Sequence, residues 1–228
     1  MCSISCKSFV GKIINQSEVT GKRILEVGSM DLNGSVRPTF EKYSPKQYWG
    51  VDMYPGPSVD QVCSVENLLN QFHKGSFDIV VTTEMLEHVK DWRTAIHNVK
   101  NLIMPGGILV LTTRSRGKLY HAYPNDFWRF EVEDMQNIFS DFEILALEKD
   151  PDSPGVFLKA RKPMSFVERD LSDYDLYSII KNRKMHDVNN GDIRMFRIVY
   201  RSKEVLKTLL PKRVIALLGG ARASYRKN

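Results

Sequence analysis

The sequence has 228 residues and is 42% hydrophobic, which is enough for one domain with a buried core plus an extension. Its three cysteines are irregularly spaced, which excludes a disulfide framework and a four-cysteine zinc site and favours a reducing compartment. The net charge of +6 is concentrated near the C-terminus, because residues 165–228 hold 14 basic and 7 acidic side chains while residues 1–164 hold 19 and 20.

Most of the chain alternates between predicted helices and strands. After a helix within residues 5–18, we expect a strand over 21–27, a helix in 35–43, a strand over 48–53, a short strand in 59–64 and a helix over 66–72. The nearly all-apolar stretch 77–83 is typical of a parallel strand covered on both faces, and 84–103 predicts one long helix. Residues 104–107, MPGG, end this helix and start the strand 108–113, because proline cannot continue a helix.

An aromatic loop over 120–130 and a helix over 132–139 come next. The strands 142–150 and 155–162 are too close together for a parallel crossover, so they are predicted to form an antiparallel pair at the sheet edge. The pattern predicts a doubly wound α/β fold, with a mostly parallel seven-stranded sheet, an antiparallel edge hairpin and a basic helical extension. We place the domain at 1–163 and the extension at 164–228.

A glycine turn follows the first predicted strand. Gly28 lacks a Cβ, so a ligand can approach its backbone closely, although a glycine after a strand is also an ordinary turn residue. The dinucleotide pattern G-x-G-x-x-G would require glycine at Met30 and at Asn33, so close passage of a pyrophosphate is disfavoured. Asp31 and Gly34 offer turn chemistry instead.

The second predicted strand ends at an acid. Asp52 can accept hydrogen bonds from the two neighbouring hydroxyls of a ribose, or it can serve as a turn residue before the Pro-Gly-Pro of residues 55–57.

The order of elements resembles the class I S-adenosylmethionine-dependent methyltransferases over about residues 20–162. The resemblance rests on four stretches: LEVGSMD (25–31), GVDM (50–53), FDIVVTTEMLEHV (77–89) and MPGGILVLTT (104–113). It implies S-adenosylmethionine as the cofactor and a cofactor site formed by Glu26, Gly28, Ser29, Asp52, Met53, Ser64, Val65 and Glu84. Most family members have a second glycine at the position of Met30, so this turn departs from the family pattern.

Three polar residues follow the strand 77–83. Glu84 ends that strand, while Glu87 and His88 are expected on the first turn of the next helix. The E-x-x-E-H pattern resembles ubiquinone-biosynthesis O-methyltransferases and small-RNA 2′-O-methyltransferases, which hold a divalent cation there. We assign no metal ligand, because His88 can equally be a general base, a substrate-orienting group or a structural residue.

The aromatic loop after the strand 108–113 is the candidate acceptor side, since loops beyond the carboxyl ends of parallel strands line the ligand cleft. His121 is a second candidate base in this loop, which also holds Tyr123, Asp126 and Trp128. The alternative is a packed aromatic loop that only covers the cofactor.

The leading hypothesis is an S-adenosylmethionine-dependent O-methyltransferase that acts on a small molecule or a saccharide, including a lipid-linked one. Glu84, His88 and His121 are the catalytic candidates, since the enzyme must align the acceptor and remove its proton. The rivals are an RNA 2′-O-methyltransferase and a non-catalytic binding protein that retains the fold.

The basic tail has ten basic residues and one acid from Arg194 onward, with apolar residues near helical spacing and the apolar run VIALLGG after Pro211. It predicts a helix packed on the domain, a helix on an anionic membrane or, less favoured, a phosphate contact with nucleic acid. Because no stretch resembles a signal peptide or a membrane span, we expect a cytoplasmic protein, with peripheral membrane contact as an alternative.

Overall fold

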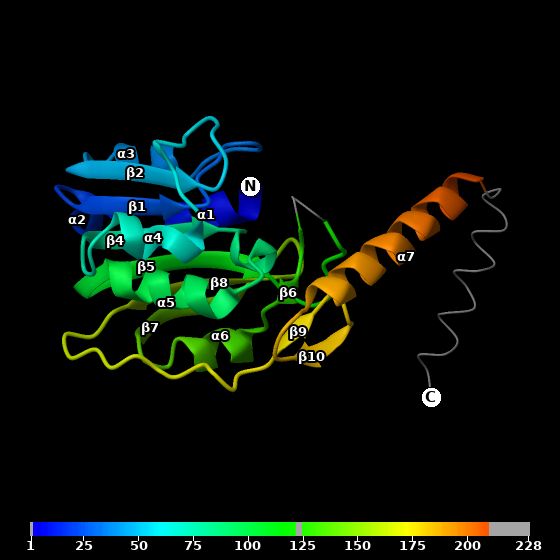
Figure 1. The fold of residues 1–228 in the computed structure, drawn as a ribbon. Helices are drawn as coiled ribbons and strands as arrows, with labels where there is room; N and C mark the ends of the chain where they lie inside the picture. Colours follow the sequence, from blue (N-terminus) through cyan, green and yellow to red (C-terminus); the bar gives the residue numbers. More distant parts are fainter. Residues whose placement is uncertain (1, 122–124, 210–228) are drawn as a thin grey trace. The chain divides into compact units, whose positions relative to one another are not determined.

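A seven-stranded sheet lies at the centre of the N-terminal unit in the computed structural model, which describes residues 2–121 and 125–209 (Figure 1). The strands are β1 (Arg23–Val27), β2 (Gln47–Asp52), β3 (Gln61–Val62), β4 (Phe77–Thr83), β5 (Ile103–Arg114), β7 (Glu143–Lys149) and β8 (Gly155–Arg161). Their order is β3-β2-β1-β4-β5-β8-β7. Among the described strands of this sheet, β8 alone runs opposite to the other six, and its antiparallel pairing with β7 confirms the predicted edge hairpin.

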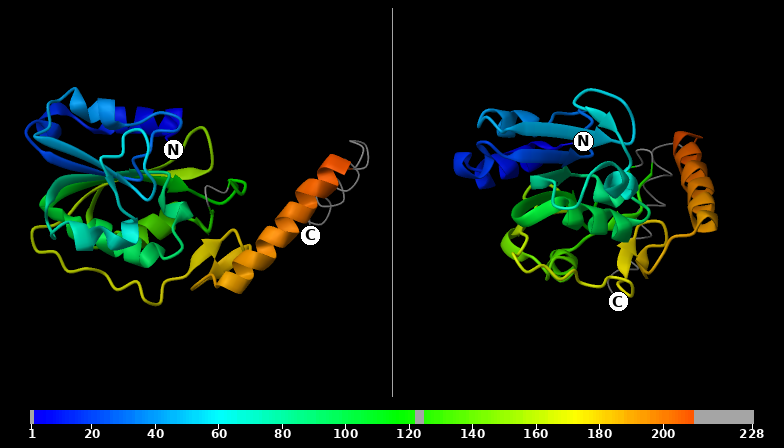
Figure 2. Two further views of the ribbon diagram at one scale, coloured as in Figure 1. Left: turned by 45° about the horizontal axis from the view of Figure 1, so that its top comes forward. Right: turned by 60° about the vertical axis from the view of Figure 1, so that its left-hand side comes forward.

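Helices cover both faces of this sheet. The helical segments are α1 (Ile4–Ile13), α2 (Gln16–Val19), α3 (Arg37–Glu41), η1 (Val65–Asn67), α4 (Leu68–Gln71), η2 (Leu86–His88), α5 (Trp92–Leu102) and α6 (Val132–Ile138). Figures 1 and 2 show α4, α5 and α6 on one face, with α1 and α3 on the other. This arrangement explains why β4 is apolar on both faces.

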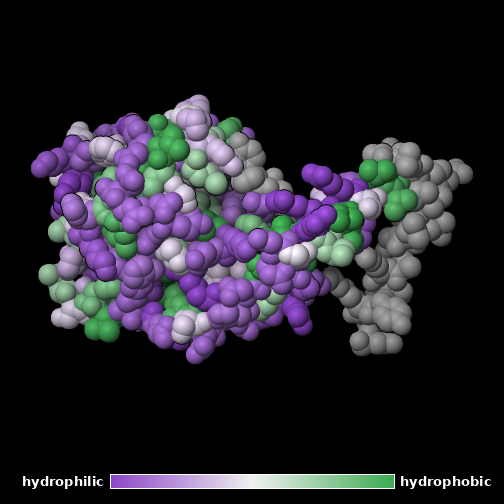
Figure 3. Space-filling view, viewed as in Figure 1, coloured by the Kyte–Doolittle hydropathy of each residue, from purple (hydrophilic) through white to green (hydrophobic). Residues whose placement is uncertain are grey.

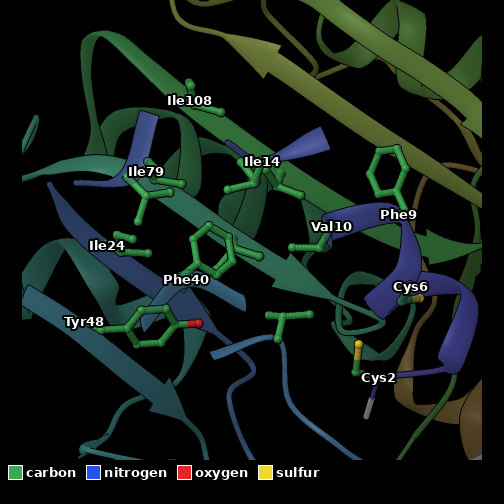
Figure 4. Packing of buried hydrophobic residues seen from close by; sticks show 14 of the residues in the cluster. Cys2, Cys6, Phe9, Val10, Ile14, Ile24, Phe40, Tyr48, Ile79 and Ile108 are labelled. Carbon is green, nitrogen blue, oxygen red and sulfur yellow. The ribbon is translucent and has the colours of Figure 1, made fainter. Parts of the chain in front are cut away.

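The core under α1 fixes the N-terminal helix to the sheet. Phe9 and Val10 of α1 are buried in one cluster with Ile24, Ile79 and Ile108 of three neighbouring strands (Figure 4). Full burial of one such side chain contributes about 1.5–3 kcal/mol, so the helix is held mainly by its apolar face.

The long helix predicted over 84–103 is wrong in its first part. Glu84 has a φ of +52°, which interrupts any helix, and residues Leu86–His88 form the short 3₁₀ turn η2. Helix α5 begins only at Trp92, because the Asp91 side chain accepts a hydrogen bond from the backbone N–H of Thr94 and caps it. Glu87 and His88 therefore lie on a separate turn before the helix.

The strand after MPGG also begins earlier than predicted. Strand β5 starts at Ile103, so residues 104–107 lie inside it rather than before it. The distortion expected of Pro and Gly appears as a register shift in the pairing with β4 and as a φ of +78° at Gly106.

A second sheet, which the sequence did not predict, extends the N-terminal unit. It contains β6 (Trp128–Arg129), β9 (Leu176–Ser178) and β10 (Arg183–Met185), paired antiparallel in the order β10-β9-β6. The unit accordingly runs to His186, and a second unit begins at Asp187. The functional boundary between residues 163 and 164 stays a prediction.

The second unit contains α7 (Asn190–Leu209), the helix expected in the basic extension. The Asn189 side chain accepts a hydrogen bond from the backbone N–H of Asp192 at 2.8 Å and so caps its first turn. The run VIALLGG lies outside the described residues. Within residues 2–121 and 125–209, no helix has the length and apolar character needed to cross a bilayer.

Candidate active site

The predicted site residues gather at the carboxyl ends of the parallel strands. Gly28 follows β1, Asp52 ends β2, and Glu84 follows β4. Strands β1 and β4 are neighbours in the sheet although they are not consecutive in the chain. Such a switch point opens a crevice beyond the strand ends, where α/β proteins bind ligands.

The turn after β1 is built without a second glycine. Gly28 has a φ of +78°, and a Cβ there would lie 2.8 Å from the Cγ atom of Met85, so a larger residue does not fit. The backbone N–H groups of Gly28 and Ser29 both donate to the Val51 carbonyl. The hydroxyl of Ser29 is buried and has no hydrogen-bond partner among the described residues, so it is available to a ligand.

Side-chain carboxylates complete this turn in place of the missing glycine. Asp31 accepts the backbone N–H of Gly34 at 2.7 Å, and Asp52 accepts that of Met30 at 3.1 Å and that of Tyr54 at 3.2 Å. Each Asp52 oxygen retains a further lone pair, so the carboxylate can still accept ribose hydroxyls. Asp52 thus stabilises the turn through its backbone hydrogen bonds and can still bind a ligand.

The other predicted cofactor residues differ in accessibility. Glu26 is only 2% exposed, accepts a hydrogen bond from the Tyr48 hydroxyl at 2.7 Å, and has its pKa raised by burial to about 7. Met53 is 51% exposed beside Asp52. After β3, the Ser64 hydroxyl donates to Glu66, and Val65 is buried.

Glu84 is engaged on the α1 face of the sheet. Its carboxylate forms an ion pair with the Arg114 guanidinium and accepts a hydrogen bond from the Cys6 thiol at 2.8 Å. Arg114 also pairs with Asp150 at 3.0 Å. This buried network ties α1 and β5 to the end of β4, and it takes Glu84 away from the two candidate histidines.

Three side chains converge on the opposite side of the β4 end. Glu87 is fully buried; its Oε2 accepts a hydrogen bond from the Thr113 hydroxyl at 2.9 Å, and its Oε1 has no hydrogen-bond partner among the described residues. The Nε2 atoms of His88 and His121 each lie 3.9 Å from that Oε1. One ligand atom from each of the three residues falls within 4.8 Å of the others.

The hydrogen bonds of the two imidazoles fix which nitrogen carries the proton. His88 Nδ1 lies 2.5 Å from the Asn125 carbonyl oxygen, and His121 Nδ1 lies 3.1 Å from both the Asp126 carboxylate and the Leu119 carbonyl. These partners only accept, so in the neutral rings Nδ1 carries the hydrogen and Nε2 carries the lone pair. Three lone-pair atoms therefore face one another, an arrangement that suits an incoming hydroxyl, a proton or a cation.

Asp126 holds His121 in place. Asp126 pairs with the buried Arg129 guanidinium at 2.5 Å, and although burial raises the pKa of Asp126, hydrogen bonds from Arg129 and His121 hold it well below its usual value. Burial lowers the pKa of His121, but Asp126, Glu87 and the Leu119 carbonyl together outweigh burial, so the net pKa is raised. Trp128 is buried in the core, which fits a packed role for that aromatic residue, and Tyr123 lies outside the described residues.

Residues 8–148 match the family described as "Methyltransferase domain". A ubiquinone biosynthesis O-methyltransferase of Xanthomonas euvesicatoria pv. vesicatoria is 34% identical over 113 residues, which cover 43% of this chain and 46% of the relative. A second, from Chromobacterium violaceum, is 31% identical over 115 residues, or 46% of this chain and 49% of the relative. The chain thus spans about half the length of the curated relatives that it matches.

The fold has solved counterparts at low sequence identity. The 1,6-didemethyltoxoflavin-N1-methyltransferase of Burkholderia thailandensis, solved with bound 1,6-didemethyltoxoflavin and S-adenosylhomocysteine, has a TM-score of 0.57 at 15% identity, and the match covers 69% of this chain and 78% of that protein. Identity this low shows a shared fold only.

Proposed function

Since this chain belongs to the class I S-adenosylmethionine-dependent methyltransferase family, we propose that it transfers a methyl group from S-adenosylmethionine to a hydroxyl of a small molecule. The main observation that supports a hydroxyl acceptor is that three lone-pair atoms, from Glu87, His88 and His121, lie close together. A hydroxyl must lose its proton to become a good nucleophile, so it needs a base of this kind. The names of the curated relatives, which are O-methyltransferases, support the same choice.

The turn after β1 and the end of β2 fit the cofactor. Gly28 makes the positive-φ turn at the end of β1, the buried Ser29 hydroxyl has no described partner, and Asp52 can accept hydroxyls at a strand end. When bound, S-adenosylmethionine supplies a methyl group already activated by a sulfonium. We place Val65 and Met53 beside it, and Glu84 at its methionine end.

The protein's own part is to bind, align and deprotonate the acceptor. We propose that the acceptor hydroxyl donates its hydrogen bond to Nε2 of His88 or His121 and loses its proton to that nitrogen as the oxygen attacks the methyl carbon. The carbon–oxygen bond forms as the sulfur–carbon bond breaks, and the proton leaves on the imidazole. The Glu87 carboxylate, 3.9 Å from both rings, stabilises the imidazolium.

The same donor set suits a divalent cation. Carboxylate and imidazole ligands bind Mg²⁺, Mn²⁺ or Zn²⁺, and one held by Glu87, His88 and His121 would lower the pKa of the acceptor hydroxyl. The proposal does not require the ion, since each imidazole can accept the proton by itself.

The test is methyl transfer from labelled S-adenosylmethionine to a panel of phenols, catechols and saccharides, with EDTA and then with added Mg²⁺ or Mn²⁺. We expect the double variant His88→Gln/His121→Gln to lower kcat by about 10²–10⁴ with little change in cofactor affinity, and Glu87→Gln to lower kcat by less. The exposed α6 variant Glu133→Gln is the matched control. Activity lost in EDTA and restored by the metal assigns the cation to the cluster.

Two outcomes would replace this proposal. Methylation of RNA alone, with an affinity that falls as salt rises, supports the RNA 2′-O-methyltransferase. Cofactor binding without methylation of any acceptor supports the non-catalytic protein, whose main motivation is the methionine at position 30 in the glycine turn.

A further inference from the structure

Helix α7 presents an exposed apolar stripe. Met195, Ile198, Val199 and Leu206 recur at helical spacing, and their exposed fractions are 63%, 53%, 43% and 53%. Ser202 falls in the same stripe, and its hydroxyl donates a hydrogen bond to the Ile198 carbonyl at 2.9 Å. Because the hydroxyl hydrogen is bonded within the helix, Ser202 adds little polarity to the stripe. Figure 3 shows hydrophobic side chains at the surface of this helix beside hydrophilic ones.

Basic side chains border the stripe on both sides. Arg194 and Arg201 are seven residues apart, so they line up along one border, and Lys203 lies along the other. Glu204 is two positions from Leu206, which turns it to the far side of the helix. From Met195 to Leu206 the apolar stripe is therefore framed by positive charge, and the acid Asp192 lies in the first turn of α7, ahead of this segment.

We propose that α7 lies on the surface of an anionic phospholipid membrane, with its apolar stripe at the boundary between headgroups and acyl chains. A helix with this pattern binds in the plane of the interface. The stems of Arg and Lys at the stripe borders extend along apolar surface while their charged ends reach lipid phosphates. The extension adds positive charge, with ten basic residues and one acid from Arg194 onward.

Two other occupants fit the helix less well. A second copy of α7 would bring basic borders together and place like charges side by side along the seam. A nucleic acid would satisfy the basic residues but not the aliphatic stripe, because bases stack on aromatic faces. The aromatic rings of Phe196 and Tyr200 in this helix stack on each other, with their centroids 5.9 Å apart.

The test is flotation of the full chain with vesicles of phosphatidylcholine alone or with roughly one third phosphatidylserine. We expect binding only to the anionic vesicles. The variant R194Q/R201Q/K203Q should weaken it by about 100-fold, since each basic residue near the surface contributes about fivefold. The variant M195S/I198S/L206S should weaken it by at least about tenfold.

Matched controls change the same chemistry elsewhere in the chain. K46Q/K74Q/K149Q removes three exposed charges outside α7, and M164S/V167S removes exposed apolar side chains outside it. Both should bind like the wild-type protein, and circular dichroism should show unchanged helix content in all variants.

Three results would overturn the proposal: no binding to anionic vesicles, binding that the stripe variant leaves unchanged, or a dimer in solution that the stripe variant abolishes. RNA affinity that depends on the basic residues but not on the stripe would assign α7 to nucleic acid instead. The assay uses no cofactor and no acceptor, so its failure is distinguishable from failure of the methyl-transfer proposal.

Discussion

At His121, two opposing effects set the protonation state. Burial lowers its pKa, while the Asp126 carboxylate at 3.1 Å raises it and, together with the Glu87 carboxylate and the Leu119 carbonyl, outweighs burial. A base must be deprotonated to act, so the raised pKa places the acidic limb of the activity profile at higher pH than an ordinary histidine would.

Asp126→Asn should lower the pKa of His121 and move that limb to lower pH. An NMR titration of the His121 ring protons in the full chain, together with the kcat profile, measures both effects. The exposed loop variant Asp173→Asn is the control and should leave both unchanged. If His121 titrates identically in Asp126→Asn, the Asp126 carboxylate does not set its pKa.

Glu26 makes the protein less stable as pH rises, whereas an acid in a salt bridge makes a protein more stable as pH rises. Burial raises its pKa from 4.5 to about 7, so between these values the folded state binds more protons than the unfolded state. The free energy of unfolding contributed by this group therefore falls as pH rises from about 4.5 to about 7.

The amide of Glu26→Gln does not ionise, so its free energy of unfolding lacks this fall. The difference in free energy of unfolding, variant minus wild type, should therefore rise by about 3 kcal/mol between pH 4.5 and pH 8. Urea unfolding at the two pH values measures the difference, with Glu133→Gln as the control. An equal effect of Glu26→Gln at both values would contradict the raised pKa.

Single residues at strand ends were predictable, and their partners were not. Gly28 and Asp52 follow apolar runs, so the sequence places both at the sheet edge. The ion pairs of Glu84 with Arg114 and of His121 with Asp126 could not be predicted, because the spacing of residues in the sequence does not show which side chains meet. Met85 over Gly28 was missed because an apolar residue after a strand carries no chemical signal.

At the scale of elements, the late start of α5 leaves Glu87 and His88 on the separate turn η2 rather than on the long helix. Asp91 caps this start through the backbone N–H and hydroxyl of Thr94. Replacing an N-cap Asp with Ala costs about 1 kcal/mol. Asp91→Ala should therefore lower the free energy of unfolding by about that amount in urea, while Asp173→Ala in a loop should have little effect; equal effects would contradict the cap.

The sequence does contain the signal for this cap, because Asp91 immediately precedes the amphipathic run of α5. Helical periodicity alone extended the prediction back to Glu84, whose positive φ cannot be read from a glutamate. Strands β9 and β10 were missed because each has only three residues, and β9 pairs with β6, which is far away in the chain.

At the scale of the whole molecule, charge and fold divide the chain into two parts. The nearly neutral residues 1–164 contain the methyltransferase sheet, and the basic extension contains α7. The alternation of apolar strands and helices predicted the seven-stranded sheet, since that order of elements admits few topologies. The acceptor itself could not be predicted, because it depends on the loops rather than on the sheet.

Calorimetric titration of S-adenosylhomocysteine into the full chain tests the central claim most directly, with Asp52→Ala beside the wild type and exposed Asp173→Ala as the control. The account predicts micromolar binding by the wild type and the control, and a clear loss of affinity in Asp52→Ala. No binding by folded wild-type protein, or equal affinity in Asp52→Ala, would contradict the cofactor site at the ends of β1 and β2.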